Sequence, residues 1–250
     1  MSASETAVAL DRAQSGAVPV EQQGEPQSLE QAYALQSEVV GLRLSRGEQL
    51  VGVKLGFTSR AKMQQMGVSE VIVGSLTDAM RVADGGELRL DGLIHPRVEP
   101  EVAFRLSRDV DLDDPTLDVE TCVDAVAPAL EVIDSRYRDF RFSLTDVIAD
   151  NTSAAAFVVG PWRPLTDVGN RAVRLVVDGS DVEIGSTAAV LGDPVRALHA
   201  LVGLARRYGL PLQAGHVVLS GAATAAVPFG GVVEARIAGL GSVTVRGTRG

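Results

Sequence analysis

Two glutamates, Glu99 and Glu101, stand one residue apart in the segment HPRVEPEVAFRL, which covers residues 95–106. In a β-strand, side chains at positions i and i+2 point to the same face, roughly 6.6 Å apart at about 3.3 Å per residue. The pair therefore shares a face with Arg105. One interpretation is a solvated polar face. The other is a pair of ligands for a hard divalent cation, since Mg²⁺ binds carboxylates together with water and substrate oxygens.

A third carboxylate, Glu131, lies between Leu130 and Val132 in the apolar segment PALEVID. The segment predicts a strand that is buried on both faces. A carboxylate in such a setting is costly unless it is paired, hydrogen-bonded or bound to a metal. A salt bridge to an arginine, or a position at the edge of a cleft, would satisfy Glu131 as well as a metal would.

A lysine, Lys54, is flanked by Gly52 and Gly56 in the segment GVKLGFTS. Glycines inside a strand permit the close approach of a ligand or of another backbone. On its own, a strand lysine is typical of a solvated or snorkelling side chain. Beside a metal, it would serve as a cationic acid and as an anchor for a substrate.

Two segments combine hydroxyl groups with small residues. In ADNTSAAAF, Ser153 could donate a hydrogen bond to a carboxylate, or the polar cluster could be only a turn or a cap. In LSGAATAAVPFGG, Thr224 is either a ligand donor or a turn hydroxyl.

The elements that must position these residues change character near residue 50. Residues 1–50 predict helices, one of which starts with a capping pattern of Ser28 and Gln31. From residue 51 onward, short β-branched segments punctuated by glycine predict strands: VGVKLGFT, VEPEVAFRL, ALEVID, AFVVG, VRLVVDG, HVVLSG and VVEARIAGLGSVTVRG. We therefore expect a helical N-terminal region, residues 1–50, and a β-rich α+β domain, residues 51–250.

Turn and cap signals divide the second region further. Asp178-Gly179 predicts a tight hairpin turn, and the glycines of 239–241 predict another. Asp114-Pro115 and Asp193-Pro194 each predict the start of a helix, the second of which ends at Gly209. Because strands and helices do not alternate regularly, a doubly wound parallel sheet is not expected.

The composition excludes several classes of function. A formal charge of −9 over 250 residues, without a cluster of lysine and arginine, argues against nucleic acid. No apolar run approaches the ~20 residues that span a bilayer, and no secretory signal is visible, so we expect a cytoplasmic protein without membrane contact. The single cysteine, Cys122, is expected to be a small buried hydrophobe. The sequence contains no phosphate-binding loop, dinucleotide fingerprint, zinc-type histidine spacing or nucleophile elbow.

Several motifs occur in an order typical of one family: VGVKLGFTSRAKMQQMGV, GSLTDAM, LIHPRVEPEVAF, PALEVIDSRYRDFRF, VIADNTSAAAFVVG, AAVLGDP and GHVVLSGAATAAVP. Together they resemble the 2-keto-4-pentenoate hydratase/4-oxalocrotonate decarboxylase family of the fumarylacetoacetate hydrolase superfamily. The resemblance runs from about residue 27 to residue 250. It implies a mixed β-sandwich roll, a bound Mg²⁺ or Mn²⁺, and a 2-oxo acid chelated through its carboxylate and keto oxygens.

The resemblance also implies roles for individual residues. The three metal ligands of the family map to Glu99, Glu101 and Glu131. Its other functional positions map to Lys54, Asp78 and Ser153. The family usually reads Asn-Ala-Ser-Ser where this chain has Asn-Thr-Ser-Ala, so Ala154 replaces the second serine.

The activity that the resemblance implies is metal-dependent decarboxylation of 2-oxo-3-hexenedioate to 2-hydroxypenta-2,4-dienoate, a step of meta-cleavage aromatic catabolism. The alternative is hydration of 2-hydroxypenta-2,4-dienoate to 4-hydroxy-2-oxopentanoate. A non-catalytic binding module on the same fold is a third hypothesis, and its support is the change at Ala154. The family commonly forms homo-oligomers, and its decarboxylases resemble proteins that pair with a hydratase.

Overall fold

The computed structural model describes residues 4–22, 28–59 and 70–250, and its centre is a nine-stranded mixed sheet. Two short strands, β8 (Arg163–Pro164) and β12 (Val227–Pro228), pair with β6 and β5 at its margins. The main path across the sheet is β2 (Ile72–Thr77), β1 (Leu50–Gly56), β11 (Val217–Ala222), β5 (Arg97–Leu106), β6 (Val123–Ile133), β7 (Ala154–Val159) and β3 (Arg81–Val82). Only the β1–β11 and β3–β7 pairs in this sheet are parallel among the described residues.

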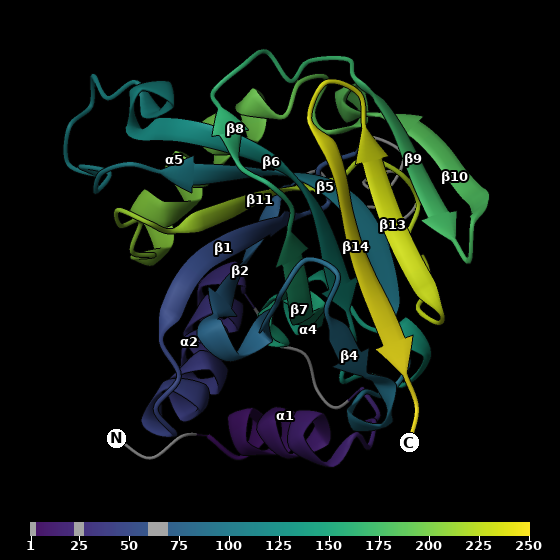
Figure 1. Cartoon of the computed structure of the whole chain (residues 1–250). Coiled ribbons are helices and arrows are strands. Elements are labelled where there is room, and N and C mark those ends of the chain that lie inside the picture. The colour runs from purple at the N-terminus through teal and green to yellow at the C-terminus, as the bar shows by residue number, and fades with distance from the viewer. Residues whose placement is uncertain (1–3, 23–27, 60–69) are drawn as a thin grey trace.

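A second sheet of five strands stands beside the first, with β13 and β14 coloured yellow in Figure 1. Its order is β10 (Ser180–Ser186), β9 (Ala172–Val177), β13 (Val232–Ile237), β14 (Gly241–Thr248) and β4 (Glu87–Arg89). Apolar side chains of both sheets form one buried cluster, which includes Leu130 and Val132 of the larger sheet and Leu175, Val233 and Val245 of the smaller. The expected α+β architecture with a mixed β-sandwich is confirmed.

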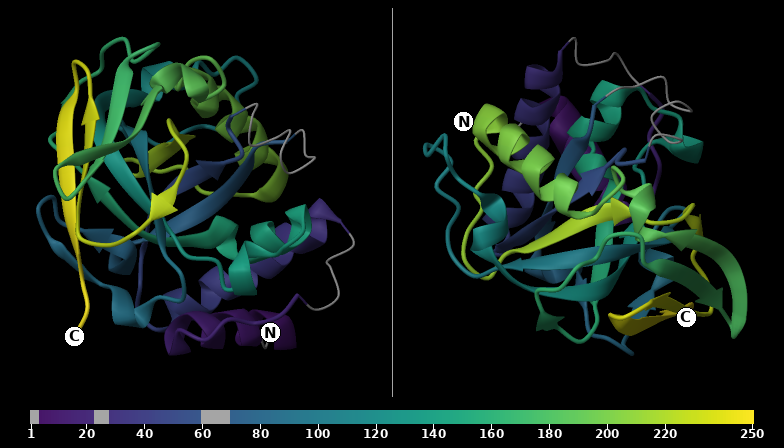
Figure 2. Two further views of the ribbon diagram at one scale, coloured as in Figure 1. Left: turned by 90° about the vertical axis from the view of Figure 1, so that its right-hand side faces the viewer. Right: turned by 90° about the horizontal axis from the view of Figure 1, so that it is seen from above.

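Four helices accompany the sheets within the described residues (Figures 1 and 2). They are α1 (Glu5–Gly16), α2 (Leu29–Ser45), α4 (Leu144–Ala149) and α5 (Val195–Tyr208). Short 3₁₀ helices cover Asp78–Met80, Leu90–Gly92, Val119–Cys122, Arg138–Phe140, Asn151–Ser153 and Thr187–Ala189. No helix in the described ranges is long and apolar enough to cross a membrane.

The predicted helix caps and hairpin turn are confirmed. Ser28 Oγ accepts a hydrogen bond from the backbone N–H of Gln31, which starts α2. Asp193 Oδ1 accepts one from Val195 at the start of α5. Asp178 and Gly179 have φ angles of 48° and 82° between β9 and β10, as a two-residue turn with both residues in the left-handed region requires.

The helix predicted at Asp114-Pro115 is wrong. Asp114 Oδ1 accepts hydrogen bonds from both the backbone and the hydroxyl of Thr116, and this closes a local turn. Such a side-chain turn competes with helix formation because it supplies the backbone with another partner. The chain then reaches the 3₁₀ helix that ends at Cys122, which is buried as expected, and continues directly into β6.

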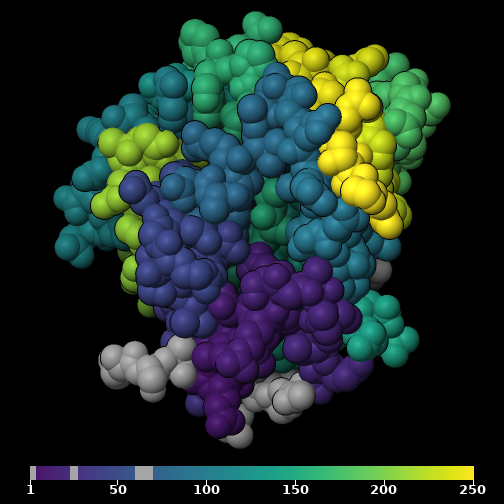
Figure 3. Space-filling model, turned by 60° about the horizontal axis from the view of Figure 1, so that its bottom comes forward, coloured from purple at the N-terminus to yellow at the C-terminus, as the bar shows by residue number. Residues whose placement is uncertain are grey.

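The N-terminal helices lie against the β-rich body, and α1 runs along its surface in Figure 3. From α2, Gln36 Nε2 donates hydrogen bonds to the carbonyl oxygens of Val73 and Ile148, at 2.9 and 2.8 Å. The hydroxyl of Tyr33 accepts one from the backbone of Val73. These contacts tie α2 to β2 and α4, and the division of the chain at residue 50 stays a prediction.

Candidate metal centre

Glu99, Glu101 and Glu131 meet on one face of the larger sheet. Glu99 of β5 lies directly opposite Glu131 of β6 in the antiparallel register, and Glu101 follows on the same face. One carboxylate oxygen from each lies within 4.8 Å of the others. Their side chains are 4%, 0% and 0% exposed, so the solvated-face interpretation is wrong. Arg105, which shares that face by alternation, is separate and pairs with Asp124.

Lys54 joins this cluster from β1, on the far side of β11. Its Nζ lies 2.7 Å from Glu131 Oε1, and both side chains are buried, which excludes the solvated-lysine interpretation. Gly52 allows this arrangement, because a Cβ at that position would collide with the carbonyl oxygen of Val217 in β11. The close approach expected from the glycines is therefore that of another backbone strand.

The cluster has more negative charge than its own lysine can neutralise. Three carboxylates and one ammonium leave a formal charge of −2 when all are ionised. Burial, then the charges of Glu131 and Glu99, raise the pKa of Glu101 well above its usual range, although Lys54 opposes the change. Burial also raises the pKa of Glu131, and again Lys54 opposes it. The raised pKa values show that burial and the neighbouring carboxylates both oppose ionisation of Glu101 and Glu131.

The oxygen atoms of the cluster suit a hard divalent cation. Glu101 Oε1 and Glu131 Oε2 are buried without a hydrogen-bond partner among the described residues. Glu101 Oε2 accepts a hydrogen bond of 2.6 Å from the backbone N–H of Gly221, which fixes that carboxylate. Mg²⁺ prefers carboxylate oxygens and carries two positive charges, so both the donor set and the charge fit it.

The polar segment Asn151–Ser153 is a buried, strained turn. All three residues have left-handed φ angles, 49°, 53° and 57°, a conformation that non-glycine residues adopt rarely. Asn151 compensates by pairing its side-chain amide with the backbone N–H and carbonyl of Ser75, as a neighbouring strand would. Ser153 Oγ is buried without a partner among the described residues, so its hydroxyl remains available to a ligand.

A buried ion pair that was not predicted from the sequence supports this turn. The Arg136 guanidinium pairs with the carboxylate of Asp150 and donates to the backbone carbonyls of Asp134, Asp150 and Ala154. Arg136 is 2% exposed and Asp150 is 0% exposed. The pair fixes the ends of two segments, the one that follows Glu131 and the one that carries Ser153. Arg136 lies in the basic stretch RYRDFR, and nothing in the sequence distinguishes it from the exposed Arg138.

Asp78 and Thr224 are not brought to the cluster. Asp78 is exposed directly after β2, next to Thr77, which pairs with Leu50, whereas Lys54 pairs with Gly74 in the middle of the strand. Asp78 Oδ1 accepts hydrogen bonds from the backbones of Gln49 and Ala79, as a turn residue does. The Thr224 hydroxyl donates to the carbonyl of Ala225, as expected of a turn hydroxyl.

Burial raises the pKa of Asp150 to about 6, although Arg136 opposes the shift. The carboxyl of Asp150 therefore binds its proton more tightly in the folded state than in the unfolded state. This contribution to the free energy of unfolding is fully present below about pH 4 and is lost as pH rises through about 6. We expect the unfolding free energy to fall over this range by about 3 kcal/mol relative to Asp150→Asn. Urea unfolding of the wild type and of Asp150→Asn across this pH range measures the difference between their unfolding free energies. The contributions of the other carboxyl groups are the same in both proteins and cancel in this difference. A constant difference would contradict it.

Comparison with known proteins assigns the chain to a family. The family model described as fumarylacetoacetate (FAA) hydrolase C-terminal matches residues 52–246. The chain belongs to the fumarylacetoacetate hydrolase family. Nine residues of the first motif, 60–68, lie outside the described part of the chain.

Individual relatives show which enzymes of the family the chain is similar to. The chain is 49% identical over 220 residues to a 4-oxalocrotonate decarboxylase of Pseudomonas sp, covering 87% of this chain and 86% of the relative. It is 40% identical to a 2-keto-4-pentenoate hydratase of Paraburkholderia xenovorans (strain LB400), over 86% and 82% of the two chains. The solved structure of 4-oxalocrotonate decarboxylase from Pseudomonas putida G7, complexed with magnesium and adipate, matches with a TM-score of 0.87 and 35% identity, covering 97% and 95%. The resemblance seen in the sequence is confirmed.

Proposed function

We propose that the chain is a divalent-metal-dependent lyase that converts 2-oxo-3-hexenedioate to 2-hydroxypenta-2,4-dienoate and CO₂. The observation that carries the proposal is the buried cluster of three glutamates, whose carboxylate oxygens converge beside Lys54. Likeness to decarboxylases over most of the chain supports the choice of substrate.

In this proposal Glu99, Glu101 and Glu131 hold Mg²⁺ or Mn²⁺. The bound ion supplies Lewis-acid polarisation of the 2-oxo group of the substrate. The backbone N–H of Gly221 orients the carboxylate of Glu101, and the ammonium group of Lys54 orients that of Glu131. The family relatives include a structure with Mn²⁺ and pyruvate, at an identity that supports the fold alone.

Lys54 contributes positive charge where the substrate gains negative charge. When the bond between C5 and C6 breaks, its electrons form the C4–C5 double bond, and the former C3–C4 π electrons form the C2–C3 double bond. The electrons of the C2 carbonyl move to its oxygen, while C6 leaves as CO₂. The Lys54 ammonium, held in a dry site, stabilises this oxyanion electrostatically, and protonation of the oxygen gives the product.

Ser153 is proposed to donate its unpartnered hydroxyl to the substrate's 2-oxo acid carboxylate. The strained turn that carries it would hold this donor in place before the substrate arrives, which reduces the cost of ordering it. We assign no catalytic role to Asp78, because it is exposed and its carboxylate accepts hydrogen bonds from the backbones of Gln49 and Ala79.

Hydration of 2-hydroxypenta-2,4-dienoate is the second candidate, favoured by relatives named hydratases at about the same identity as some named decarboxylases. Hydration needs a base that activates water, which decarboxylation does not need. An assay of both substrates with Mg²⁺, following CO₂ and product together, decides between the two. A metal-loaded protein that releases no CO₂ from 2-oxo-3-hexenedioate would refute the main proposal. If calorimetry detected no binding of divalent cations, the decarboxylase and hydratase proposals would both be rejected in favour of a non-catalytic binding module.

Replacing Glu99 with glutamine tests the ligand assignment. The variant keeps the shape of the side chain but removes one negative ligand, so we expect Mg²⁺ affinity to fall about tenfold or more. Isothermal titration with Mg²⁺ measures this directly. Glu120→Gln, an exposed glutamate that pairs with His199, is the matched control and should bind Mg²⁺ like the wild type. Unchanged affinity in Glu99→Gln would contradict the assignment.

We further propose that the protein is a cytoplasmic homo-oligomer that pairs with a hydratase. The family resemblance supports this arrangement, since a hydratase would consume the dienoate product. Light scattering of the purified protein, alone and mixed with such a hydratase, tests both parts.

A further inference from the structure

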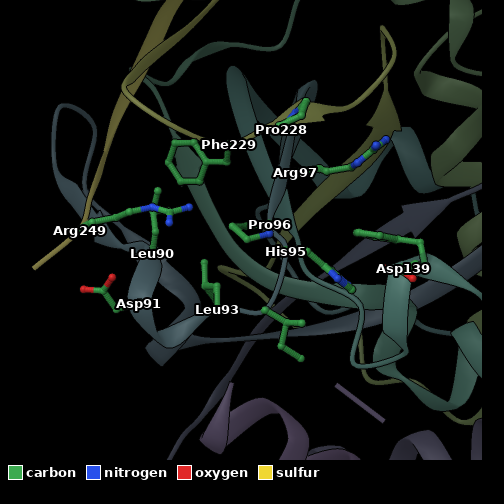
Figure 4. Close-up of a pocket in the computed structure, with 12 residues that line it drawn as sticks. Leu90, Asp91, Leu93, His95, Pro96, Arg97, Asp139, Pro228, Phe229 and Arg249 are labelled. Carbon is green, nitrogen blue, oxygen red and sulfur yellow. The ribbon is translucent and has the colours of Figure 1, made fainter. Parts of the chain in front are cut away.

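A cavity of about 660 Å³ opens at the start of β5, next to the candidate metal centre along the same strand. Its lining includes Phe140, with Arg97 and His95 on one side and Arg249 and Asp91 on the other, as Figure 4 shows for these four labelled residues. None of the three glutamates lines it. Arg97 belongs both to the cavity and to the strand that carries Glu99, so this residue connects the two.

The register of β5 places Arg97 on the glutamate face. Arg97 and Glu99 are two residues apart, and they pair with Ile133 and Glu131 of β6. Their Cα atoms are therefore roughly 6.6 Å apart with side chains on the same face. Along this face, exposure increases from Glu101, fully buried, through Glu99, 4% exposed, to the exposed Arg97. Arg97 is thus the exposed end of the face that carries the carboxylates.

Arg97 carries a charge without an ion-pair partner among the described residues. Its guanidinium lies 5.6 Å from the centre of the Phe140 ring, which in turn packs on His95 at 4.6 Å. The backbone that leads into Arg97 is fixed, because both oxygens of Asp134 accept hydrogen bonds from the N–H groups of Ile94 and His95. A stacked, unpaired guanidinium on a fixed backbone suits a planar carboxylate, which it can bind through two parallel hydrogen bonds.

We infer that Arg97 binds the distal carboxylate of a dicarboxylic 2-oxo acid and so selects diacids over monoacids. The inference deepens the proposed function and rests on it. In an extended six-carbon diacid, C2 and C6 are separated by roughly 5 Å across four carbon–carbon bonds. That span is shorter than the roughly 6.6 Å between the Cα atoms of Glu99 and Arg97, so the long arginine side chain can reach the distal carboxylate of an acid bound at the glutamates. Asp139 lines the same cavity, so its negative charge opposes the attraction between Arg97 and a carboxylate.

The selected group is also the one that leaves as CO₂, which gives Arg97 a characteristic kinetic effect. A carboxylate loses its charge during decarboxylation, so an ion pair to Arg97 is stronger in the ground state than in the transition state. Replacing Arg97 with methionine should therefore raise KM for 2-oxo-3-hexenedioate about tenfold without lowering kcat. A residue that only maintained the fold would lower kcat as well.

Binding of two unreactive analogues to the Mg²⁺-loaded protein tests the inference without turnover. 2-Oxoadipate has the distal carboxylate, and 2-oxohexanoate lacks it. We expect the wild type to prefer 2-oxoadipate about tenfold in calorimetric titrations, as one charge-assisted pair in a partly solvated site would give. Arg97→Met should lose this preference and bind 2-oxohexanoate as the wild type does.

Two matched variants complete the experiment. Arg105→Met, on the same strand but paired with Asp124, and Arg249→Met, on the opposite side of the cavity, should both keep the preference. A preserved preference in Arg97→Met, or its loss in Arg249→Met instead, would overturn the inference. If the wild type released CO₂ from the diacid but bound both analogues equally, the inference would fail and the proposed function would stand. No CO₂ release would refute the proposed function itself.

Discussion

Replacing Lys54 with methionine is expected to lower kcat for decarboxylation at least 100-fold without weakening Mg²⁺ binding. The ammonium is the positive charge within hydrogen-bond distance of Glu131, and removal of one preorganised electrostatic donor typically costs a factor of 10²–10³. Its loss also changes the formal charge of the cluster from −2 to −3. A divalent cation is attracted more strongly to the more negative cluster, so the two measurements should move in different directions.

Steady-state kinetics and Mg²⁺ titration of the same preparation check this prediction. Thermal unfolding adds a third measurement, because Mg²⁺ should raise the Tm of Lys54→Met more than that of the wild type. Arg43→Met is the matched control: Arg43 of α2 is a largely buried cation that pairs with Glu48, so its loss should leave kcat unchanged. If Lys54→Met kept wild-type turnover, the proposed role of Lys54 would be wrong. Weaker Mg²⁺ binding by Lys54→Met would contradict the expectation that the more negative cluster attracts the cation more strongly.

Replacing Arg136 with methionine should lower the free energy of unfolding at pH 7 by about 3–5 kcal/mol, as expected when one partner of a buried ion pair is removed. The Asp150 carboxylate would remain at 0% exposure without its counter-ion, and the carbonyls of Asp134 and Ala154 would each lose a donor. Urea unfolding measures the change. Because the pair fixes the turn that carries Ser153, activity should fall even where the variant is folded.

Arg138→Met provides the matched comparison two residues away. Arg138 pairs with Glu21 at the surface, where an ion pair contributes about 0–1 kcal/mol. The double variant Arg136→Met/Asp150→Asn should recover part of the lost stability, because it no longer buries an unpaired charge. A loss below about 1 kcal/mol in Arg136→Met would show that the buried pair does not stabilise the fold as we expect.

Local patterns predicted much of the fold. Alternation placed Glu99 and Glu101 on one face, Ser28 and Asp193 start their predicted helices, and Asp178-Gly179 forms its hairpin turn. Each of these features depends on neighbours within a few residues. The prediction at Asp114 failed for a local reason too, since aspartate closes a turn as readily as it caps a helix.

Periodicity in the sequence predicted less of the candidate site than of the fold. Alternation cannot tell a solvated face from one that another layer covers, so the burial of Glu101 required knowledge of β11 and Gly221. The apolar setting of Glu131 and the glycines around Lys54 singled out both residues, and the family resemblance assigned both to the site. Their pairing at 2.7 Å is seen only in the structure. Arg97 and Arg136 escaped notice because an arginine's partners lie far away in the chain or belong to a ligand.

The insertion of β11 between β1 and β5 makes the metal centre a late product of synthesis and folding. β11 pairs in parallel with β1, where Gly52 meets Val217, and it pairs antiparallel with β5. A nascent chain that lacks β11 has all four charged residues of the cluster, yet nothing holds Lys54 beside Glu131 or orients Glu101. Such non-local pairing is slow to form. In the proposed site the acidic residues therefore come together only when nearly the whole chain has left the ribosome, and we expect metal binding to require the complete fold.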